Sequence, residues 1–471
     1  MRFPVLLLAC SCLLSAQTIL FQHVTVIDGT GALPKRDVSV LVRDGRIASV
    51  EKKLGPPPAG SLVIDAKNKF LIPGLWDMHV HITDPKVQFP LLLANGVVGV
   101  REMYSAVAMQ TQREWAKLPD APQVVVSGFV DGPQPRAGVW PDAYAIVDPD
   151  SARAAAQLLA ALRPDFIKIY NGVPRSAFFA LADTLRAAGI PFAGHVPEEV
   201  SPLEASNAGM RSQEHLNNLL LAASSHEEEL RKQRVQGMND PALSGAARLR
   251  LLGWPLTEGL FDTYDARKAA VLFKTFVANR TYQTPTLAVL SGYAHAPQEG
   301  SINDPRRKYL PKPWTDLWDW RGSPYLSDLS AEEYGVLNAR MRALLDRYKK
   351  LVGDMSRAEV PLLAGTDTNP VNPVLPGWGL HEELALLAES GLTPMQALQA
   401  ATRNPARYFD REKETGTIEV GKVADLVLLE ADPLKDIRNT QKINAVVLGG
   451  RLYARQDLDA MLERARGASG R

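Results

Sequence analysis

Two histidines, His79 and His81, end an apolar run that begins at Leu71. In a β-strand the side chains at positions i and i+2 point to the same face, so the two imidazoles would lie side by side. Imidazole is the commonest protein ligand for zinc-like metals. The spacing therefore predicts a metal-binding pair. For these two residues alone, a surface strand without any ligand role explains the pattern equally well.

Further residues that could bind a metal follow later apolar segments. Three segments end in His195, His215 and Asp367, and the strand-like run 165–170 carries Lys168 inside it. A lysine in a buried strand is unfavourable unless its charge is paired or chemically removed. Taken singly, a strand histidine is most often a core residue, and a Thr-Asp pair is most often a helix cap or turn. The joint order His-x-His, Lys, His, His, Asp at successive strand ends indicates one metal site.

This order, together with the motif Pro-Gly-Leu-Trp-Asp-Met-His-Val-His, resembles the metal-dependent amidohydrolase superfamily. Within it the chain is similar to the imidazolonepropionase-like and binuclear Xaa-Pro dipeptidase-like group. The resemblance implies two divalent metal ions, which we expect to be zinc. It implies these metal ligands: His79, His81, Lys168, His195, His215 and Asp367. In the binuclear members the lysine is carboxylated and bridges the two ions, which is the role expected for Lys168.

The expected reaction is metal-assisted hydrolysis of an amide C–N bond by a metal-bound hydroxide. Paired metal ions lower the pKa of bound water and polarise the scissile carbonyl. Asp367 is the expected catalytic residue, which accepts a proton and delivers it to the leaving amine. The expected substrates are small peptide-like molecules such as dipeptides or N-acyl amino acids. The expected substrate-binding residues are Tyr170, Arg101 and His381, placed to hold a terminal carboxylate.

Two other functions are compatible with the same residues. A cyclic-amide hydrolase of the imidazolonepropionase type, or a deaminase, would use the same fold with one metal ion. Deaminases usually place a catalytic glutamate beyond the strand-five histidine, and Glu198 and Glu199 occupy such positions. The second alternative is a metal-free barrel that only binds a partner. Such proteins lose metal ligands, whereas all six candidate ligands are present here.

The elements that must position these residues alternate between short apolar strands and amphipathic helices over residues 71–412. This alternation predicts an α/β fold with a (β/α)8 TIM barrel. The expected strands are 71–82, 97–103, 123–130, 165–170, 191–195, 211–215, 284–290 and 361–367. Active sites of such barrels lie at the carboxyl ends of the strands, where the candidate ligands stand.

Strand-rich segments flank the barrel. Residues 17–70 and 413–456 predict one small β-sandwich domain built from both termini, and residues 457–471 predict a polar helical tail that frays.

Two long insertions interrupt the barrel at 216–264 and 291–330, and the second contains Trp314, Trp318 and Trp320. Long loops on this face of a barrel often form the substrate wall or lid. Packing of the loop on the barrel by its tryptophans is the equally favoured interpretation.

Composition and the first residues limit the partners and the compartment. Lysine plus arginine (53) nearly equals aspartate plus glutamate (52), so the chain lacks the basic excess of nucleic-acid-binding proteins. Residues 1–16 resemble a signal peptide whose apolar core is too short to span a bilayer. We expect export to the periplasm or the exterior, with a lipoprotein anchored at Cys10 as the alternative.

Both cysteines, Cys10 and Cys12, lie in this predicted signal peptide, so the mature chain would have no disulfide and no thiolate ligand. No later apolar run is long enough to span a membrane. We therefore expect a small-molecule or peptide-like substrate as the partner of this chain, no integral membrane span, and a homo-oligomer.

Overall fold

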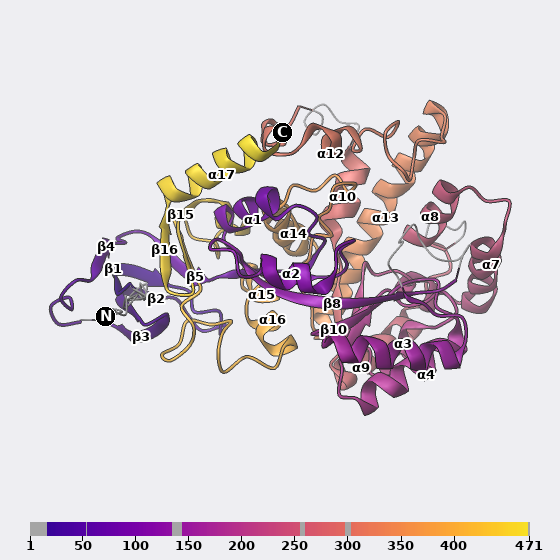
Figure 1. The fold of residues 1–471 in the computed structure, drawn as a ribbon, viewed down its shortest axis with the longest axis horizontal. Helices are drawn as coiled ribbons and strands as arrows, with labels where there is room; N and C mark the ends of the chain where they lie inside the picture. The colour runs from indigo at the N-terminus through magenta and orange to yellow at the C-terminus, as the bar shows by residue number, and fades with distance from the viewer. Residues whose placement is uncertain (1–16, 53, 134–143, 255–259, 297–302, 470–471) are drawn as a thin grey trace, which may run out of the picture.

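The computed structural model describes residues 17–469 apart from 53, 134–143, 255–259 and 297–302 (Figure 1). The predicted signal peptide, including Cys10, lies outside the described residues. Among the helices that are described, none is both long enough and apolar enough to cross a membrane.

A parallel barrel occupies the middle of the chain. Neighbouring strands in this barrel are hydrogen-bonded in the order β6 (Leu75–Val80), β7 (Val97–Glu102), β8 (Gln123–Asp131), β10 (Phe166–Ile169), β11 (Phe192–Gly194), β12 (Ser212–Glu214) and β13 (Tyr282–Thr284). The irregular segment 361–368 closes the gap between β13 and β6 through single parallel bridges, from Gln283 to Leu362 and from Val80 to Thr368. The predicted α/β barrel is therefore confirmed, with an eighth strand that is only partly regular.

The predicted strand 284–290 is wrong. Strand β13 ends at Thr284, and Leu287–His295 forms helix α10. Thr286 between them has a left-handed backbone (φ 49°), which ends the extended conformation. Periodicity cannot distinguish a short apolar run in a strand from a buried helical turn, which is why the sequence pattern misassigned this segment.

The predicted strand 71–82 divides into two strands at Gly74. Residues Phe70–Pro73 form β5, which belongs to a different sheet, and β6 begins at Leu75. A Cβ atom at Gly74 would come within 2.4 Å of the Val98 side chain, so only glycine allows the chain to pass between the two sheets here.

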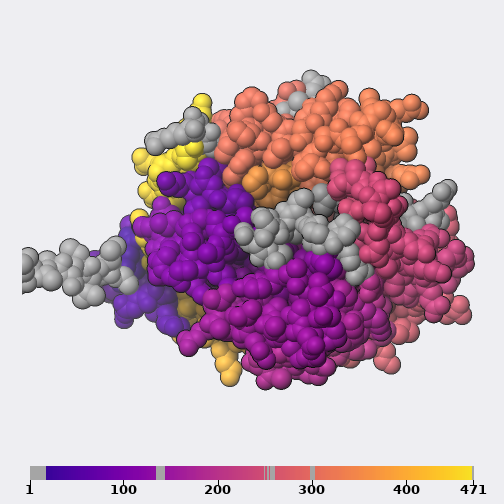
Figure 2. Space-filling view, turned by 45° about the vertical axis from the view of Figure 1, so that its right-hand side comes forward, coloured from indigo at the N-terminus to yellow at the C-terminus, as the bar shows by residue number. Residues whose placement is uncertain are grey.

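Helices surround the barrel. Those that follow or connect its strands are α1 (Pro85–Ala94), α2 (Met109–Trp115), α3 (Pro149–Leu162), α4 (Arg175–Ala187), α5 (Pro202–Asn207), α9 (Ala266–Asn279), α13 (Ala331–Arg357), α14 (Trp378–Glu389), α15 (Pro394–Ala400) and α16 (Arg403–Tyr408). The insertions add α6 (Leu219–Ala222), α7 (Glu227–Asn239), α8 (Gly245–Gly253), η1 (Pro305–Tyr309) and α12 (Lys312–Asp316). In the space-filling view, the purple and magenta first half of the barrel lies below the salmon and orange helices of the second half (Figure 2).

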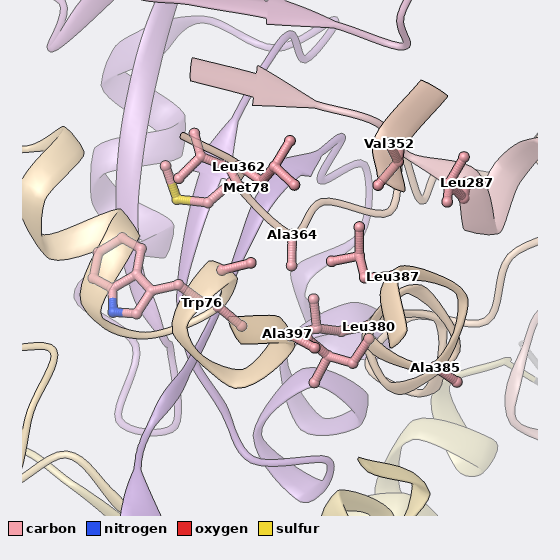
Figure 3. Packing of buried hydrophobic residues seen from close by; sticks show 14 of the residues in the cluster. Trp76, Met78, Leu287, Val352, Leu362, Ala364, Leu380, Ala385, Leu387 and Ala397 are labelled. Atoms are coloured by element: carbon pink, nitrogen blue, oxygen red, sulfur yellow. The ribbon is translucent and has the colours of Figure 1, made fainter. Parts of the chain in front are cut away.

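Strand β6 shows how the barrel wall aims its side chains. Trp76 and Met78 belong to the buried apolar cluster that also contains Ala364 and Leu380 (Figure 3). Because side chains alternate along a strand, the residues between and after them point to the opposite face. His79 is therefore directed into the barrel by the packing of its neighbours.

A second sheet combines strands from both ends of the chain and lies beside the barrel (Figure 1). Its order is β16 (Arg451–Ala454), β15 (Ile443–Leu448), β14 (Leu426–Leu429), β5, β1 (Ile19–Val26), β2 (Lys35–Arg43) and β3 (Arg46–Glu51), with β4 (Leu62–Asp65) also paired to β1. Apolar residues from both ends, such as Phe21, Val40 and Leu428, form one cluster within it. The strands of the expected sandwich are thus hydrogen-bonded as one continuous sheet.

The helix predicted over 457–471 is present up to Ser469, the last described residue, and it packs against the protein where fraying was expected. Helix α17 (Arg455–Ser469) buries Leu458, Met461 and Ala465, and it packs along α1 (Figure 1). The spacing i, i+3, i+7 of these three residues forms an apolar stripe, and the charged residues between them occupy the outer face.

The tryptophans of the second insertion attach this loop to the rest of the molecule. Trp314 and Trp318 pack against a buried cluster that includes Leu310 and Leu375, and the Trp320 ring stacks on Tyr334 with centroids 5.0 Å apart. The structure therefore favours the packing interpretation of these residues over a substrate wall.

Candidate active site

The six predicted ligands converge at the carboxyl ends of the barrel strands. Asp367 Oδ1 lies 3.0 Å from His81 Nε2 and 3.6 Å from His79 Nε2. The His215 ring has its centroid 4.5 Å from that of His79 and 4.6 Å from that of His195. These imidazoles and Lys168 approach one another around a chamber of about 50 Å³, which His81, Lys168, His195, His215 and Asp367 help to line.

Hydrogen bonds at Nδ1 fix the orientation of all four imidazoles. The partners are Glu214 for His79 (2.8 Å), the Tyr104 carbonyl for His81 (2.7 Å), the Asn171 amide oxygen for His195, and the Thr286 hydroxyl for His215 (2.7 Å). Such bonds leave Nε2 as the nitrogen available to a metal ion, as is usual for metal-binding histidines.

The Nε2 atom of His79 is the observation that most directly indicates a bound cation. It is buried and has no hydrogen-bond partner among the described residues. A buried polar atom without a partner costs free energy, so such atoms are rare unless an ion or water satisfies them. One nitrogen or oxygen from each of His79, His81 and Asp367 lies within 4.8 Å of the other two, which is close enough to hold one ion. The residues present therefore fit a metal.

Electrostatics keep most of these imidazoles neutral, which is the form that binds metal. Burial, and then the nearby Lys168, hold the pKa of His79 and of His195 well below the usual value. Burial also lowers the pKa of His215 to about 4. His81 differs, because burial lowers its pKa, but the hydrogen bond to Asp367 and the charges of Asp367 and Glu102 together outweigh burial and raise it.

Lys168 lies on the wall of the chamber and is 1% exposed. It makes no hydrogen bond or ion pair with any described residue, and its Nζ is 5.9 Å from the centroid of the Tyr170 ring. Burial lowers its pKa to about 8. A Cβ atom at Gly194 would come within 2.8 Å of Lys168 Cδ and 2.2 Å of the Ile169 carbonyl oxygen, so this glycine leaves space for the lysine stem.

Several site residues have left-handed backbones. The φ angles are 62° at His215, 49° at Thr286 and 56° at Asp367. Non-glycine residues in this region are strained, and such strain concentrates at functional sites. At these positions the conformation turns the chain at the end of a strand.

Arg101 does not lie at the mouth, contrary to the sequence prediction. Its guanidinium is fully buried, donates to both carboxylate oxygens of Glu214 (2.8 and 2.9 Å), and also donates to Ser212 Oγ and to the Met78 carbonyl. Glu214 in turn binds His79. Arg101 is therefore part of the support beneath the histidines, because no substrate atom could reach it there.

His381 is also misplaced by the sequence prediction. It is fully buried on α14, where its two ring nitrogens contact Thr440 Oγ1 (2.9 Å) and the Asn95 carbonyl (3.1 Å). It thus joins α14 to the chain after α1 and to η2 (Ile437–Gln441), away from the chamber. Burial lowers its pKa to about 4.

This shift predicts a loss of stability in acid. The unfolded His381 takes up a proton near pH 6.5, whereas the folded one does so near pH 4, so the unfolded state binds more protons in this window. Stability should fall by up to about 1.4 kcal/mol per pH unit between these values. Urea unfolding at pH values from 7 to 4 gives the free energy of unfolding as a function of pH. This free energy should fall less steeply with decreasing pH for His381→Gln than for wild type. Equal slopes would contradict this assignment.

Tyr170 is the one predicted substrate-binding residue that faces the chamber. Its ring lies 4.2 Å from that of His195. It lines both the chamber and an adjoining pocket of about 90 Å³. A larger cleft of about 850 Å³ lies elsewhere, around Arg186, Arg211 and Arg280, and none of the predicted ligands lines it.

The supporting residues are the ones that the sequence interpretation missed. They are Asp77, Asn171, Glu214, Thr286 and Asn372. The sequence did indicate Asp77 and Glu214. Asp77 stands two residues before His79, and Ser212 stands two residues before Glu214, so each pair shares one face of its strand. Polar residues at inward strand positions need partners. Asn171, Thr286 and Asn372 follow strand ends and carry no pattern of their own.

The glutamates of the deaminase alternative do not face the chamber. Glu198 forms a buried ion pair with Arg234 and accepts a hydrogen bond from Asn171. Glu199 accepts a hydrogen bond from the Arg175 backbone at the start of α4. Through Asn171, Glu198 supports His195 instead of approaching a substrate.

Comparison with known proteins agrees with this geometry. Residues 348–453 match the model of the amidohydrolase family. Ochratoxinase from Aspergillus niger is 34% identical over 119 residues, which cover 24% of this chain and 24% of that protein. The chain thus matches about a quarter of the length of this curated relative. The matches confirm the predicted resemblance to amidohydrolases.

Solved structures resemble nearly the whole chain. Bottromycin amidohydrolase superposes with a TM-score of 0.68 at 22% identity, covering 96% of this chain and 91% of that one. A Xaa-Pro dipeptidase with methionine in its active site superposes with a TM-score of 0.64 at 17% identity, covering 93% and 100%. At these identities the likeness shows the shared fold.

Proposed function

We propose that this protein is a metal-dependent hydrolase of amide C–N bonds in small peptide-like molecules, such as dipeptides or N-acyl amino acids. The observation that carries this proposal concerns His79 Nε2. This atom is buried, has no hydrogen-bond partner among the described residues, and lies beside Asp367 and the other converging ligands. The match of residues 348–453 to the amidohydrolase family model and the local similarity to ochratoxinase support the same class of reaction.

Two metal ions, with zinc as the proposed metal, would be held by the ligand set in two groups. His79, His81 and Asp367 form one group, and His195 and His215 form the other, with Lys168 on the chamber wall as the proposed bridge. Bound divalent ions supply an activated water and polarise a carbonyl oxygen.

Asp367 is the proposed proton carrier. Its Oδ2 accepts a hydrogen bond from Asn372 (2.9 Å), and Asn372 also binds the Asp367 backbone carbonyl, which fixes the carboxylate. The pKa of Asp367 is low, because its contacts with His215, His81 and Lys168 outweigh burial. A carboxylate that is ionised at rest can take a proton from the attacking water and pass it to the leaving amine.

Metal removal tests this function. Purified protein should contain bound metal, and dialysis against a chelator should lower hydrolysis of dipeptides or N-acyl amino acids at least about a hundredfold, because the Lewis acid supplies several kcal/mol. Zinc, manganese or cobalt should restore the activity. His79→Ala should lose metal and activity together, whereas His295→Ala, whose ring contacts Ser291, should keep both. Full activity in chelated protein would contradict the proposal.

Export remains a proposal that rests on residues 1–16.

A further inference from the structure

An aromatic pocket opens beside the chamber. We define it by the rings of Tyr170, Trp254, Tyr293, Tyr325 and Tyr348, with Val289 and Leu290. It shares Tyr170, His195, His215 and Asp367 with the chamber wall, so the two spaces adjoin. One molecule can therefore place a group in the pocket and a scissile bond at the histidines.

Three rings of this pocket pack against one another. Trp254 meets Tyr293 edge to face at 5.1 Å between centroids, and Tyr325 lies 6.2 Å from each of them. These contacts hold Trp254, Tyr293 and Tyr325 together as one aromatic surface. They present a wall against which another ring can pack edge to face or offset, the geometry that aromatic pairs prefer.

Many polar atoms around the pocket already have partners. The Tyr293 hydroxyl donates to Asn372 (2.9 Å), the Tyr348 hydroxyl donates to the Leu216 carbonyl (3.4 Å), and the Thr286 hydroxyl contacts His215. No lysine or arginine lines the pocket among the residues that the structure describes. A carboxylate would lose its hydration there without gaining an opposite charge, which is unfavourable.

We propose that the aromatic pocket binds an uncharged aromatic group of the amide substrate, an inference that rests on the proposed function. The pocket of about 90 Å³ adjoins the chamber of about 50 Å³, so a ring seated against the aromatic side chains can use the space that the two share. This assignment replaces the carboxylate site predicted from Arg101 and His381, both of which are buried elsewhere.

The first test compares N-acetyl derivatives of phenylalanine, leucine, glutamate and lysine, which differ only in the side chain. We expect kcat/KM for the phenylalanine derivative to exceed those for the glutamate and lysine derivatives at least tenfold, which is about 1.4 kcal/mol. A second series compares N-phenylacetyl-alanine with N-succinyl-alanine. It tests the case in which the aromatic ring is on the acyl side of the scissile amide. Equal rates within both series, or a preference for lysine or for the acidic groups, would overturn the inference.

Variants locate the preference in the pocket. Val289→Trp, which fills it, should lower the ratio of kcat/KM for N-acetyl-phenylalanine to that for N-acetyl-alanine at least tenfold. Trp254→Ala, which removes one wall, should change the ratio in the same direction. Trp320→Ala is the matched control, because this ring stacks on Tyr334 outside the pocket and should leave the ratio unchanged. An unchanged ratio in both pocket variants would overturn the assignment.

Calorimetric binding separates this inference from the proposed function. N-acetyl-L-phenylalaninamide should bind wild-type protein at least tenfold more tightly than Val289→Trp. If no amide is hydrolysed by metal-loaded protein, the proposed function fails, and this binding difference still decides whether the pocket takes a ring. If amides are hydrolysed without any difference in binding or rate, only the pocket assignment fails.

Discussion

Replacing Lys168 with alanine is expected to lower kcat/KM by about a thousandfold or more. The neutral amine of a lysine can form an N–C bond with carbon dioxide and release a proton, which converts a side chain that would repel a cation into an anionic ligand. Burial in the chamber wall and a pKa lowered to about 8 favour the neutral amine that this reaction needs. Loss of such a bridge removes several kcal/mol of charge stabilisation, and roughly 4 kcal/mol corresponds to a thousandfold in rate.

The measurements for Lys168→Ala are steady-state kinetics and metal content. Acetate should partly restore the rate, because a short carboxylate can occupy the vacated space. Lys168→Arg is the matched variant that keeps a positive charge of similar length but cannot be carboxylated. If it retained normal rates and two metal ions, the bridging role would be wrong. Lys274→Ala, a change in the helix α9 outside the barrel, serves as the control for general effects of losing a lysine.

The positions of the candidate ligands were predictable because their geometry is local. The i, i+2 spacing of His79 and His81 and the position of His195 after an apolar run fix which way each side chain points once a strand forms. The alternation of strands and helices then fixes that these ends meet at one face of the barrel. No knowledge of distant contacts is required for either step.

Arg101 and His381, whose positions were wrongly predicted from the sequence, are placed by contacts between distant segments. Arg101 and Glu214 are far apart in the sequence, and only the closed barrel shows that Glu214 neutralises the arginine beneath the site. His381 opens a helix after the last strand, a position from which a side chain can reach the mouth or pack outward, and here Thr440 and Asn95 bind it outside. The sequence therefore identifies a charged residue at a strand end as a candidate ligand. Its partner in the folded barrel decides whether it contacts the substrate or holds another site residue in place.

Arg101→Met is expected to reduce the free energy of unfolding by about 3–5 kcal/mol, the usual cost of breaking a buried ion pair by removing one partner. Glu214 would stay buried beside Ser212 and His79 without its positive partner. Because Glu214 fixes the His79 ring, kcat should also fall, by about 10–100-fold as for other residues that orient metal ligands. The KM should change little, since Arg101 has no path to a substrate.

Arg175→Met is the matched control for this prediction. Arg175 pairs with Glu204 at the surface, where both side chains are partly exposed to water, so its removal should cost at most about 1 kcal/mol and leave the kinetics unchanged. Denaturant unfolding of the metal-loaded variants measures the stability difference, and metal analysis checks whether the metal content changes. A raised KM with unchanged stability in Arg101→Met would assign Arg101 to the substrate and contradict the supporting role, because a residue that only holds Glu214 cannot alter binding without altering the fold.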